Sequence, residues 1–208
     1  VARRLAHEIK NPLTPIQLSA ERLQLKLIDH LNEADQAMLT RATQTIVNQV
    51  EAMKNLANGF RDYARLPPPQ LARVDLNALL HEVLVLYEGS SVPISAELAA
   101  DLPFVQADAS QLRQVIHNLL QNAQDAVAEH APANISVLTR LDGKRVELLV
   151  RDSGTGFPAA ILARALEPYV TTKPRGSGLG LAIVRKIIEE HRGDISLHNR
   201  SEGGAEVK

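Results

Sequence analysis

Residues 5–22 read LAHEIKNPLTPIQLSAER. Apolar residues in and just beyond this stretch recur at spacings of four and three, as on one face of an amphipathic helix: Leu5, Ile9, Leu13, Ile16, Ala20, Leu23 and Leu27. At roughly 100° per residue, His7 lies about 200° round the helix from Leu5 and Ile9. We therefore expect the His7 imidazole to point into solvent, with Asn11 on the same face.

A second apolar series with the same rhythm follows: Leu39, Ile46, Val50, Met53, Ala57, Phe60 and Ala64. Polar residues between 29 and 35 supply a turn, so the pattern predicts an antiparallel helical hairpin over residues 1–66. Two such helices bury little apolar surface alone, and we expect two chains to pair as a homodimeric four-helix bundle. Residues 67–69 are three prolines, which predict a short semi-rigid linker over residues 67–71.

Residues 72–208 have a mixed pattern. Helices are predicted at 76–86, 109–129 and 179–191, and strands at 92–97 and 194–198. Residues 135–141 and 146–150 predict a β-hairpin around Asp142-Gly143. The predicted fold class is α+β, with the helical hairpin followed by an α/β sandwich domain.

Composition excludes several classes of protein. The chain has 208 residues, 45% of them hydrophobic, and a net charge of -1, so a nucleic-acid partner is not expected. It contains no Cys, which excludes disulfides and thiolate metal sites. It has no apolar run near eighteen residues and no leader, so we expect it to be soluble. It starts inside an apparent helix and stops within an apparent strand, so we expect it to be a piece of a longer protein. Membrane contact is expected only through segments outside this chain.

Two asparagines mark the long helix predicted at 109–129. Asn118 and Asn122 are four residues apart and share a face, opposite a predicted buried side of Leu112, Leu119, Ala123 and Ala126. Their carboxamide oxygens can hold Mg²⁺ and its waters, and their NH₂ groups can donate to phosphate oxygens. Taken alone, such a pair is also typical of ordinary helix surface.

Two glycine-containing segments follow. Residues 152–157 read DSGTGF and come straight after a predicted strand, where a buried Asp152 carboxylate could accept a hydrogen bond from an adenine amino group. Residues 171–181 read TTKPRGSGLGL and lead into a helix, whose amides could bind phosphate. A tight turn and a flexible surface loop are the plain alternatives for these two segments.

Together, residues 7–14, 114–123, 152–157 and 171–181 resemble the phospho-acceptor, asparagine, first glycine and lid boxes of bacterial sensor histidine kinases. The order of the boxes is that of the family, and residues 5–22 with 60–64 look most like the nitrogen-regulation kinases of the NtrY type. The resemblance implies an ATP-binding domain of the type shared with gyrase, the ninety-kilodalton heat-shock chaperone and MutL. It also implies ATP and Mg²⁺ as ligands, autophosphorylation of His7, and transfer to an aspartate of a response regulator. The implied location is the cytoplasmic region of an inner-membrane sensor protein.

The resemblance also implies roles for individual residues. His7 would be the phospho-acceptor, Glu8 its general base, and Asn11 would position a water for dephosphorylating the response regulator. Mg²⁺ would be held by Asn118 and Asn122. The nucleotide would contact these two and Asp125, Asp152, Gly154, Gly156, Tyr169, Thr171, Thr172, Lys173, Arg175, Gly176, Ser177, Gly178, Leu179, Gly180 and Leu181.

Three positions bear on the comparison with that family. Hydrolysing relatives usually carry a Glu where this chain has Asn118, which cannot take a proton from water and so favours phosphoryl transfer. Leu166 replaces an aromatic residue that often packs in the lid. Asp125 stands where some branches have a basic residue, which leaves phosphate neutralisation to Mg²⁺, Lys173 and Arg175. The rival hypotheses are an ATP-hydrolysing module of the same fold and a dimeric scaffold with an inactive nucleotide site.

Overall fold

The computed structural model describes residues 2–64, 66–90, 92–128, 132–173 and 176–208, and only the backbone of residues 2–8, 10 and 62. The chain divides into two compact units. The first comprises residues 1–66 and 171–179, and the second comprises residues 67–170 and 180–208. Each unit is described by itself.

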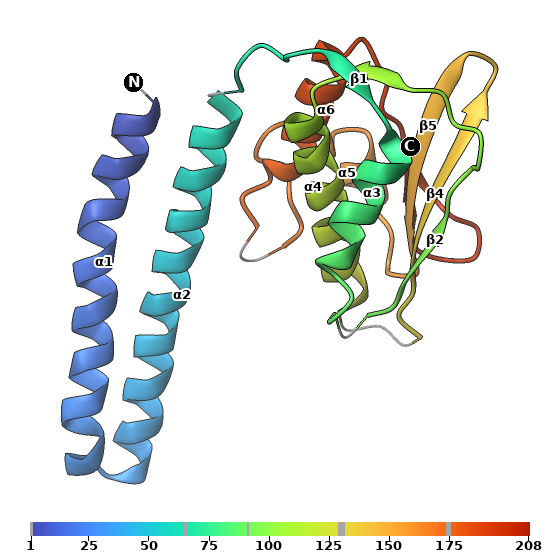
Figure 1. Cartoon of the computed structure of the whole chain (residues 1–208). Coiled ribbons are helices and arrows are strands. Elements are labelled where there is room, and N and C mark those ends of the chain that lie inside the picture. Colours follow the sequence, from blue (N-terminus) through green and yellow to red (C-terminus); the bar gives the residue numbers. More distant parts are fainter. Residues whose placement is uncertain (1, 65, 91, 129–131, 174–175) are drawn as a thin grey trace. The chain divides into compact units, whose positions relative to one another are not determined.

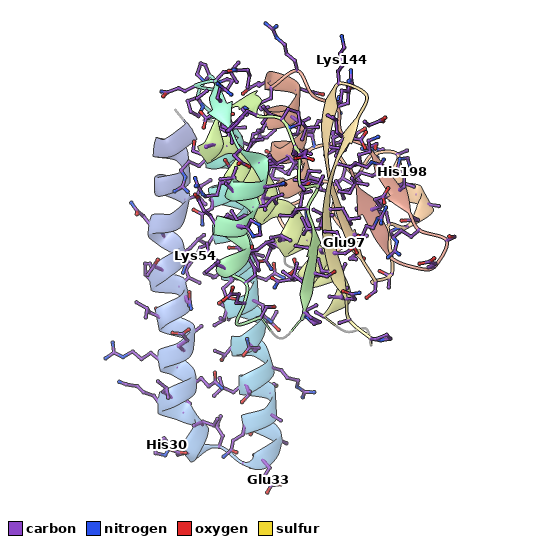
Figure 2. The ribbon with its side chains drawn as sticks, turned by 45° about the vertical axis from the view of Figure 1, so that its right-hand side comes forward. His30, Glu33, Lys54, Glu97, Lys144 and His198 are labelled. Carbon is purple, nitrogen blue, oxygen red and sulfur yellow. The ribbon has the colours of Figure 1, made fainter. Side chains whose placement is uncertain are left out.

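The first unit contains the predicted helical hairpin, formed by α1 (Ala2–Leu27) and α2 (Glu33–Ala64) with a short 3₁₀ helix η1 (Ile28–His30) between them (Figure 1). The side chain of Asn32 accepts a hydrogen bond from the Asp35 N–H at 3.0 Å, which satisfies one of the free donors at the start of α2. The connection is therefore shorter than the predicted polar turn at 29–35. His30 and Glu33 lie at this end of the hairpin (Figure 2).

Only part of the predicted apolar seam is buried within one hairpin. Leu13, Ala20, Val50 and Ala57 are at most 5% exposed. Five further residues of the seam are between 42% and 56% exposed: Ile16, Leu23, Leu27, Ile46 and Met53. One hairpin thus leaves a row of large apolar side chains uncovered along its length.

The second unit is a two-layer α/β structure in which α3, α4 and α6 lie beside one face of a sheet (Figure 1). Its helices are α3 (Leu76–Val85), α4 (Ala109–Val127), α5 (Ala159–Leu162) and α6 (Gly180–Glu190). Its strands are β1 (Ala72–Val74), β2 (Ile94–Glu97), β3 (Val105–Ala107), β4 (Ile135–Asp142), β5 (Arg145–Asp152), β6 (Leu197–Asn199) and β7 (Ala205–Val207). Five strands form one sheet in the order β2-β4-β5-β7-β6, parallel between β2 and β4 and antiparallel elsewhere, while β1 and β3 pair separately.

The core between the layers is aliphatic. Leu80 of α3, Ile116 and Leu120 of α4, Val137 of β4 and Ile187 of α6 are at most 1% exposed. The predicted helices, the β4–β5 hairpin and the α+β class are thus confirmed.

The helix α4, which carries both asparagines, is fixed at its N-terminus by a side-chain cap. The Asp108 carboxylate accepts hydrogen bonds from the N–H groups of Ser110, Gln111 and Gln70, and from the Ser110 hydroxyl at 2.6 Å. These bonds lower the pKa of Asp108 to about 2, and the bond from the Ser110 hydroxyl contributes most. The ring Nε2 of His191, just after α6, accepts from the Asp108 N–H at 2.9 Å and so ties the ends of the two helices together.

Some predicted details were wrong. The last predicted strand, 194–198, is displaced to Leu197–Asn199, the residues that pair with β7. The strands β1 and β3 and the helix α5 were not predicted, since three or four residues are too few to establish a period. In α4, Leu112 and Ala126 are half-buried, and the buried side is instead Gln111, Val115, Ile116, Leu119, Leu120, Ala123 and Val127. Among the described helices, none is both long and apolar enough to cross a membrane.

Candidate functional site: a nucleotide site beside α4

The two asparagines of α4 face the N-terminus of α6. A Cβ placed on Gly180, the first residue of α6, would lie 3.5 Å from Asn118 Oδ1 and 3.7 Å from Asn122 Nδ2. The first N–H groups of a helix have no partner within it, and the helix dipole adds partial positive charge there. Two carboxamides and a helix N-terminus are therefore brought together in a place suited to an anion.

Asp152 ends β5 and is 8% exposed. Its Oδ1 accepts hydrogen bonds from the N–H of Gly154 at 2.8 Å and of Ala205 at 3.3 Å. Two backbone donors hold the carboxylate in a fixed orientation, which is what recognition of a flat polar base requires.

Gly154 packs directly against α4. A Cβ at this position would lie 2.4 Å from the carbonyl oxygen of Ala126, a distance that real Cβ atoms do not reach. Because Ala126 follows Asn122 by one helical turn, this contact fixes the spacing between the Asp152 loop and the asparagine face. The glycine is required here by the close approach of two backbones.

The same loop is held from its other side by Asn199, which the sequence reasoning missed. Asn199 Oδ1 accepts from the Phe157 N–H at 2.7 Å, and Asn199 Nδ2 donates to the Phe157 carbonyl at 2.7 Å. Gly156, with φ of +70°, leaves room for this side chain, since a Cβ there would lie 2.7 Å from Asn199 Oδ1. No local pattern could have found a partner 42 residues away along the chain.

The lid residues 171–179 belong to the first compact unit and are described apart from Asn118 and Asp152. Thr171 and Thr172 are exposed, and Thr171 Oγ1 accepts from the Lys173 N–H at 3.0 Å. The exposed Gly176 donates its N–H to the Lys173 carbonyl at 3.1 Å. Toward the end of the segment, Gly178 has φ of +64°, the Leu179 N–H donates to Ser177 Oγ at 3.3 Å, and the Leu179 side chain is fully buried.

The remaining predicted residues are scattered. In the second unit, Tyr169 is 54% exposed with φ of +67°, Leu181 is half-buried on α6, and Asp125 is exposed and accepts from Gln121 Nε2 at 2.9 Å. In the first unit, Asn11 is exposed on α1. The side chains of His7 and Glu8, and all of Arg175, lie outside the described residues.

Comparison with known proteins assigns both parts of the chain. Residues 1–69 match the family model "His Kinase A (phospho-acceptor) domain", and residues 107–208 match "Histidine kinase-, DNA gyrase B-, and HSP90-like ATPase". The chain belongs to the sensor histidine kinases. The family predicted from the four sequence boxes is thus confirmed.

Several individual proteins resemble this kinase region. It is 39% identical to "Nitrogen regulation protein NtrY" of Azorhizobium caulinodans over 98% of the chain and 27% of that protein. Among solved structures, full-length ShkA in complex with AMPPNP superposes with a TM-score of 0.67 at 26% identity, covering 99% of this chain and 44% of ShkA.

The histidine kinase ThkA matches in two structures. Its catalytic domain gives a TM-score of 0.60 at 32% identity, covering 66% of this chain and 92% of that domain. Its complex with the response regulator protein TrrA gives 0.68 at 28% identity, covering 99% of this chain and 58% of ThkA. The chain spans roughly a quarter to a third of the length of the first curated relatives that it matches.

The residues of the kinase's nucleotide site fit a magnesium nucleotide. Two amide oxygens on one helix face suit a cation that keeps most of its own waters, as Mg²⁺ does. Within the described ranges, no group of three or more His, Cys, Asp or Glu could hold a metal ion. Phosphates would then meet the N-terminus of α6, and a base would meet the oriented Asp152 carboxylate.

Proposed function

We propose that this kinase region uses ATP to phosphorylate His7 and then passes the phosphoryl group to an aspartate of a response regulator. The observation that carries the proposal is the position of Asn118 and Asn122 beside the N-terminus of α6. This arrangement offers donors and amide oxygens to a triphosphate, but Asn118 cannot activate a water molecule. A site built in this way holds ATP without hydrolysing it efficiently, which a slower transfer to His7 requires.

We propose the roles within the nucleotide site from the arrangement of Asn118, Asn122 and Asp152 and from the family resemblance. Asp152 would accept a hydrogen bond from the adenine amino group, with Gly154 and Gly156 allowing the base to approach the backbone. Asn118 and Asn122 would hold Mg²⁺, which supplies charge neutralisation at the phosphates when bound. The phosphates and the lid side of the nucleotide would contact Thr171, Thr172, Lys173, Arg175, Gly176, Ser177, Gly178, Leu179, Gly180 and Leu181, with Asp125 and Tyr169 at the edge.

The acceptor side of the reaction lies on α1. Glu8, next to His7 in the sequence, would keep the imidazole neutral at the attacking nitrogen and take up its proton. Asn11 is exposed and lies one helical turn after His7. It would position a water molecule for the phosphatase reaction, in which the response regulator is dephosphorylated. Residues 1–66 would act as the acceptor domain and residues 72–208 as the catalytic domain. The linker 67–71 would let the two approach, since phosphoryl transfer depends on alignment.

A homodimer accounts for the exposed part of the hairpin. Ile16, Leu23 and Met53, each between 47% and 56% exposed, lie on the predicted seam and have no covering element among the described residues of their unit. Pairing two hairpins into a four-helix bundle would remove this row of apolar side chains from water. The ThkA–TrrA complex supports a response regulator as the second partner. The name of the Azorhizobium relative supports a role in nitrogen regulation, and the cytoplasmic region of a membrane sensor is the location we propose.

Radiolabelled ATP separates this function from its rivals. With γ-labelled ATP and Mg²⁺, the kinase should incorporate label that is stable to alkali and labile to acid, and release little free phosphate. Asn118→Ala should abolish incorporation, while Gln121→Ala, an exposed neighbour on α4, should not. Rapid release of free phosphate without protein label would point to an ATPase, and absence of nucleotide binding to a scaffold. Transfer from the labelled protein to a panel of receiver domains would then identify the regulator.

A further inference from the structure

The turn that joins β6 to β7, residues 200–204, lies against the end of β5. It is closed by its own backbone: the Arg200 N–H donates to the Gly204 carbonyl at 3.0 Å, and the Gly203 N–H donates to the Arg200 carbonyl at 3.2 Å. Gly203 and Gly204 have φ of +94° and +83°, a region that glycine adopts without strain. The turn is therefore a tight structure that can hold a neighbouring residue in place.

The neighbouring residue is Asp152, the last residue of β5. A Cβ on Gly204 would lie 1.9 Å from the Asp152 carbonyl oxygen, so the two backbones are in direct contact. The turn also approaches the glycine segment, because a Cβ on Gly156 would lie 3.1 Å from the Gly204 carbonyl oxygen. The β6–β7 turn thus forms one side of the proposed adenine loop.

Arg200 adds a side-chain bond to this contact. Its Nη1 donates to the Asp152 main-chain carbonyl at 3.3 Å, and its Nη2 donates to the Glu202 carboxylate at 3.0 Å. The two bonds use different nitrogens of one planar group, which fixes the orientation of the guanidinium. The Glu202 side chain is 80% exposed, so its ion pair with Arg200 contributes little free energy by itself. The bond that joins the turn to β5 is the one to Asp152.

Asp152 lies one residue beyond the regular pairing of β5 with β7, which ends at the pair of Arg151 and Glu206. Beyond that pair, the Ala205 N–H donates to the Asp152 carboxylate at 3.3 Å, and Arg200 donates to the Asp152 carbonyl. The β7 side of the sheet thus holds this residue at two points, one on its side chain and one on its main chain. Because both are held, the carboxylate can neither rotate nor shift with the backbone freely.

We propose that Arg200 is a positioning residue for recognition of the adenine amino group. By bonding the Asp152 carbonyl, it keeps the Asp152 carboxylate where it accepts a hydrogen bond from that amino group. The inference rests on the proposed function, in which Asp152 binds adenine. Its consequence is base specificity, because loss of the Arg200 bond lets the carboxylate move. The bond to the amino group then weakens, while the contacts of the phosphates stay as they are.

The test compares ATP with purine riboside triphosphate, which is ATP without its amino group. The ratio of the two dissociation constants measures the bond to the amino group, and a general loss of folded protein leaves this ratio unchanged. We expect a ratio of about ten or more in the wild type, because the acceptor is a charged group. In Arg200→Ala the ratio should fall by about threefold or more, mainly through weaker binding of ATP.

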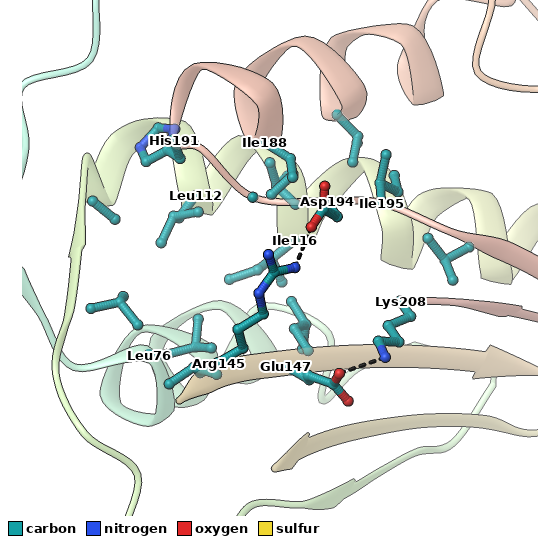
Figure 3. Close-up of a pocket in the computed structure, with 18 of the residues that line it drawn as sticks. Leu76, Leu112, Ile116, Arg145, Glu147, Ile188, His191, Asp194, Ile195 and Lys208 are labelled. Carbon is teal, nitrogen blue, oxygen red and sulfur yellow. Dashed lines mark hydrogen bonds and ion pairs between the residues drawn. The ribbon is translucent and has the colours of Figure 1, made fainter. Parts of the chain in front are cut away.

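Arg145→Ala is the matched control. Arg145 is the first residue of β5, at the opposite end from Asp152, and its side chain pairs with Asp194 (Figure 3). This variant also removes an arginine ion pair beside the sheet, but the cavity at which that pair lies is not lined by Asp152 or Arg200. Its ratio should equal that of the wild type. An undiminished ratio in Arg200→Ala, or an equal weakening of both nucleotides, would overturn the inference.

Hydrogen exchange tests the positioning step without nucleotide. The amides of Gly154 and Ala205 both donate to Asp152 Oδ1, so a carboxylate that is free to move should protect them less. In Arg200→Ala we expect both to exchange faster by about threefold or more, with no change at the buried Leu149 of β5. Unchanged exchange at both amides would overturn the inference and leave the proposed kinase function intact. A nucleotide ratio near one in the wild type would instead overturn the binding of adenine by Asp152, and the role of Arg200 with it.

Discussion

Asn199 of β6 holds Phe157 by both of its main-chain polar groups, accepting from its N–H and donating to its carbonyl, each at 2.7 Å. Phe157 closes the glycine segment that begins at Asp152. The Asn199 side chain, from the edge strand of the sheet, thus makes the two hydrogen bonds that a neighbouring strand would otherwise make. It holds the loop that we propose binds adenine.

Replacing this clamp should weaken nucleotide binding more than it destabilises the fold. We expect Asn199→Ala to raise the Kd for ATP about tenfold, because two hydrogen bonds of roughly 1 kcal/mol each cease to order the loop. Isothermal titration would measure the change. His198→Ala, at the exposed neighbouring position, is the matched control and should bind ATP normally. An unchanged Kd in Asn199→Ala would show that the loop keeps its shape without the clamp.

Gly154→Ala should damage both stability and nucleotide binding. The added Cβ would lie 2.4 Å from the Ala126 carbonyl oxygen, so either α4 or the Asp152 loop must move. Overpacking of this kind costs about 1–3 kcal/mol, which thermal unfolding would detect. Gly89→Ala serves as the control, since nothing lies within 4 Å of its Cβ position. Equal Tm values for the two variants would mean that the loop does not pack on α4 as described.

Acid should destabilise the second unit partly through Asp108. Its pKa is lowered to about 2 in the folded protein by hydrogen bonds that a protonated carboxyl group cannot accept as well. A depressed carboxyl pKa adds stability above the unfolded value, near 4, and that stability is lost as pH falls toward 2. Asp108→Asn keeps the cap oxygen without the charge, so its stability should fall less steeply between pH 4 and pH 2. Urea titrations at several pH values would measure this. Asp101→Asn, at an exposed turn, is the control and should lose stability with falling pH as the wild type does. If the free energy of unfolding fell equally steeply with pH in the wild type, Asp108→Asn and Asp101→Asn, Asp108 would not be a source of the acid sensitivity.

The exposed row on the hairpin predicts a dimer that a single charge should disrupt. Leu23 is 56% exposed on α1, and Leu23→Glu would place a carboxylate in the expected bundle core, where burial of an unpaired charge is unfavourable. Sedimentation equilibrium should report a monomer for this variant. Leu86→Glu, at a position of similar chemistry and 69% exposure beyond α3, should remain dimeric. A wild-type monomer at micromolar concentration would contradict the bundle.

The features predicted correctly from the sequence are those that a local periodicity of apolar and polar residues indicates. The hairpin helices, α4 with Asn118 and Asn122 on one face, and the β4–β5 hairpin were all correct, because each depends on residues within a few positions of one another. The strands β1 and β3 were missed because each has only three residues, too few to show a periodic pattern. Each is defined by its pairing with the other. The limits of the strand predicted at 194–198 were wrong for a similar reason, since they depend on where β7 lies and not on a local pattern.

Within the site, the sequence predicted the candidate nucleotide-binding residues but not the groups that hold them in place by hydrogen bonds. The spacing of Asn118 and Asn122 and the position of Asp152 were sufficient to propose nucleotide binding. Asn199, which holds the loop, and the backbone of Ala205, which orients the Asp152 carboxylate, come from distant strands and have no local pattern. Contacts of this kind depend on the folded sheet, so only the structure reveals them.

The central claim is that His7 is the phosphoryl acceptor, and locating the phosphate tests it most directly. After incubation with ATP and Mg²⁺, peptides kept at alkaline pH should carry phosphate on His7 by tandem mass spectrometry. His7→Gln should lose the adduct, while His30→Gln, at the exposed histidine of η1, should keep it. Phosphate that persists in His7→Gln, or that maps to another residue of the wild-type chain, would contradict the account.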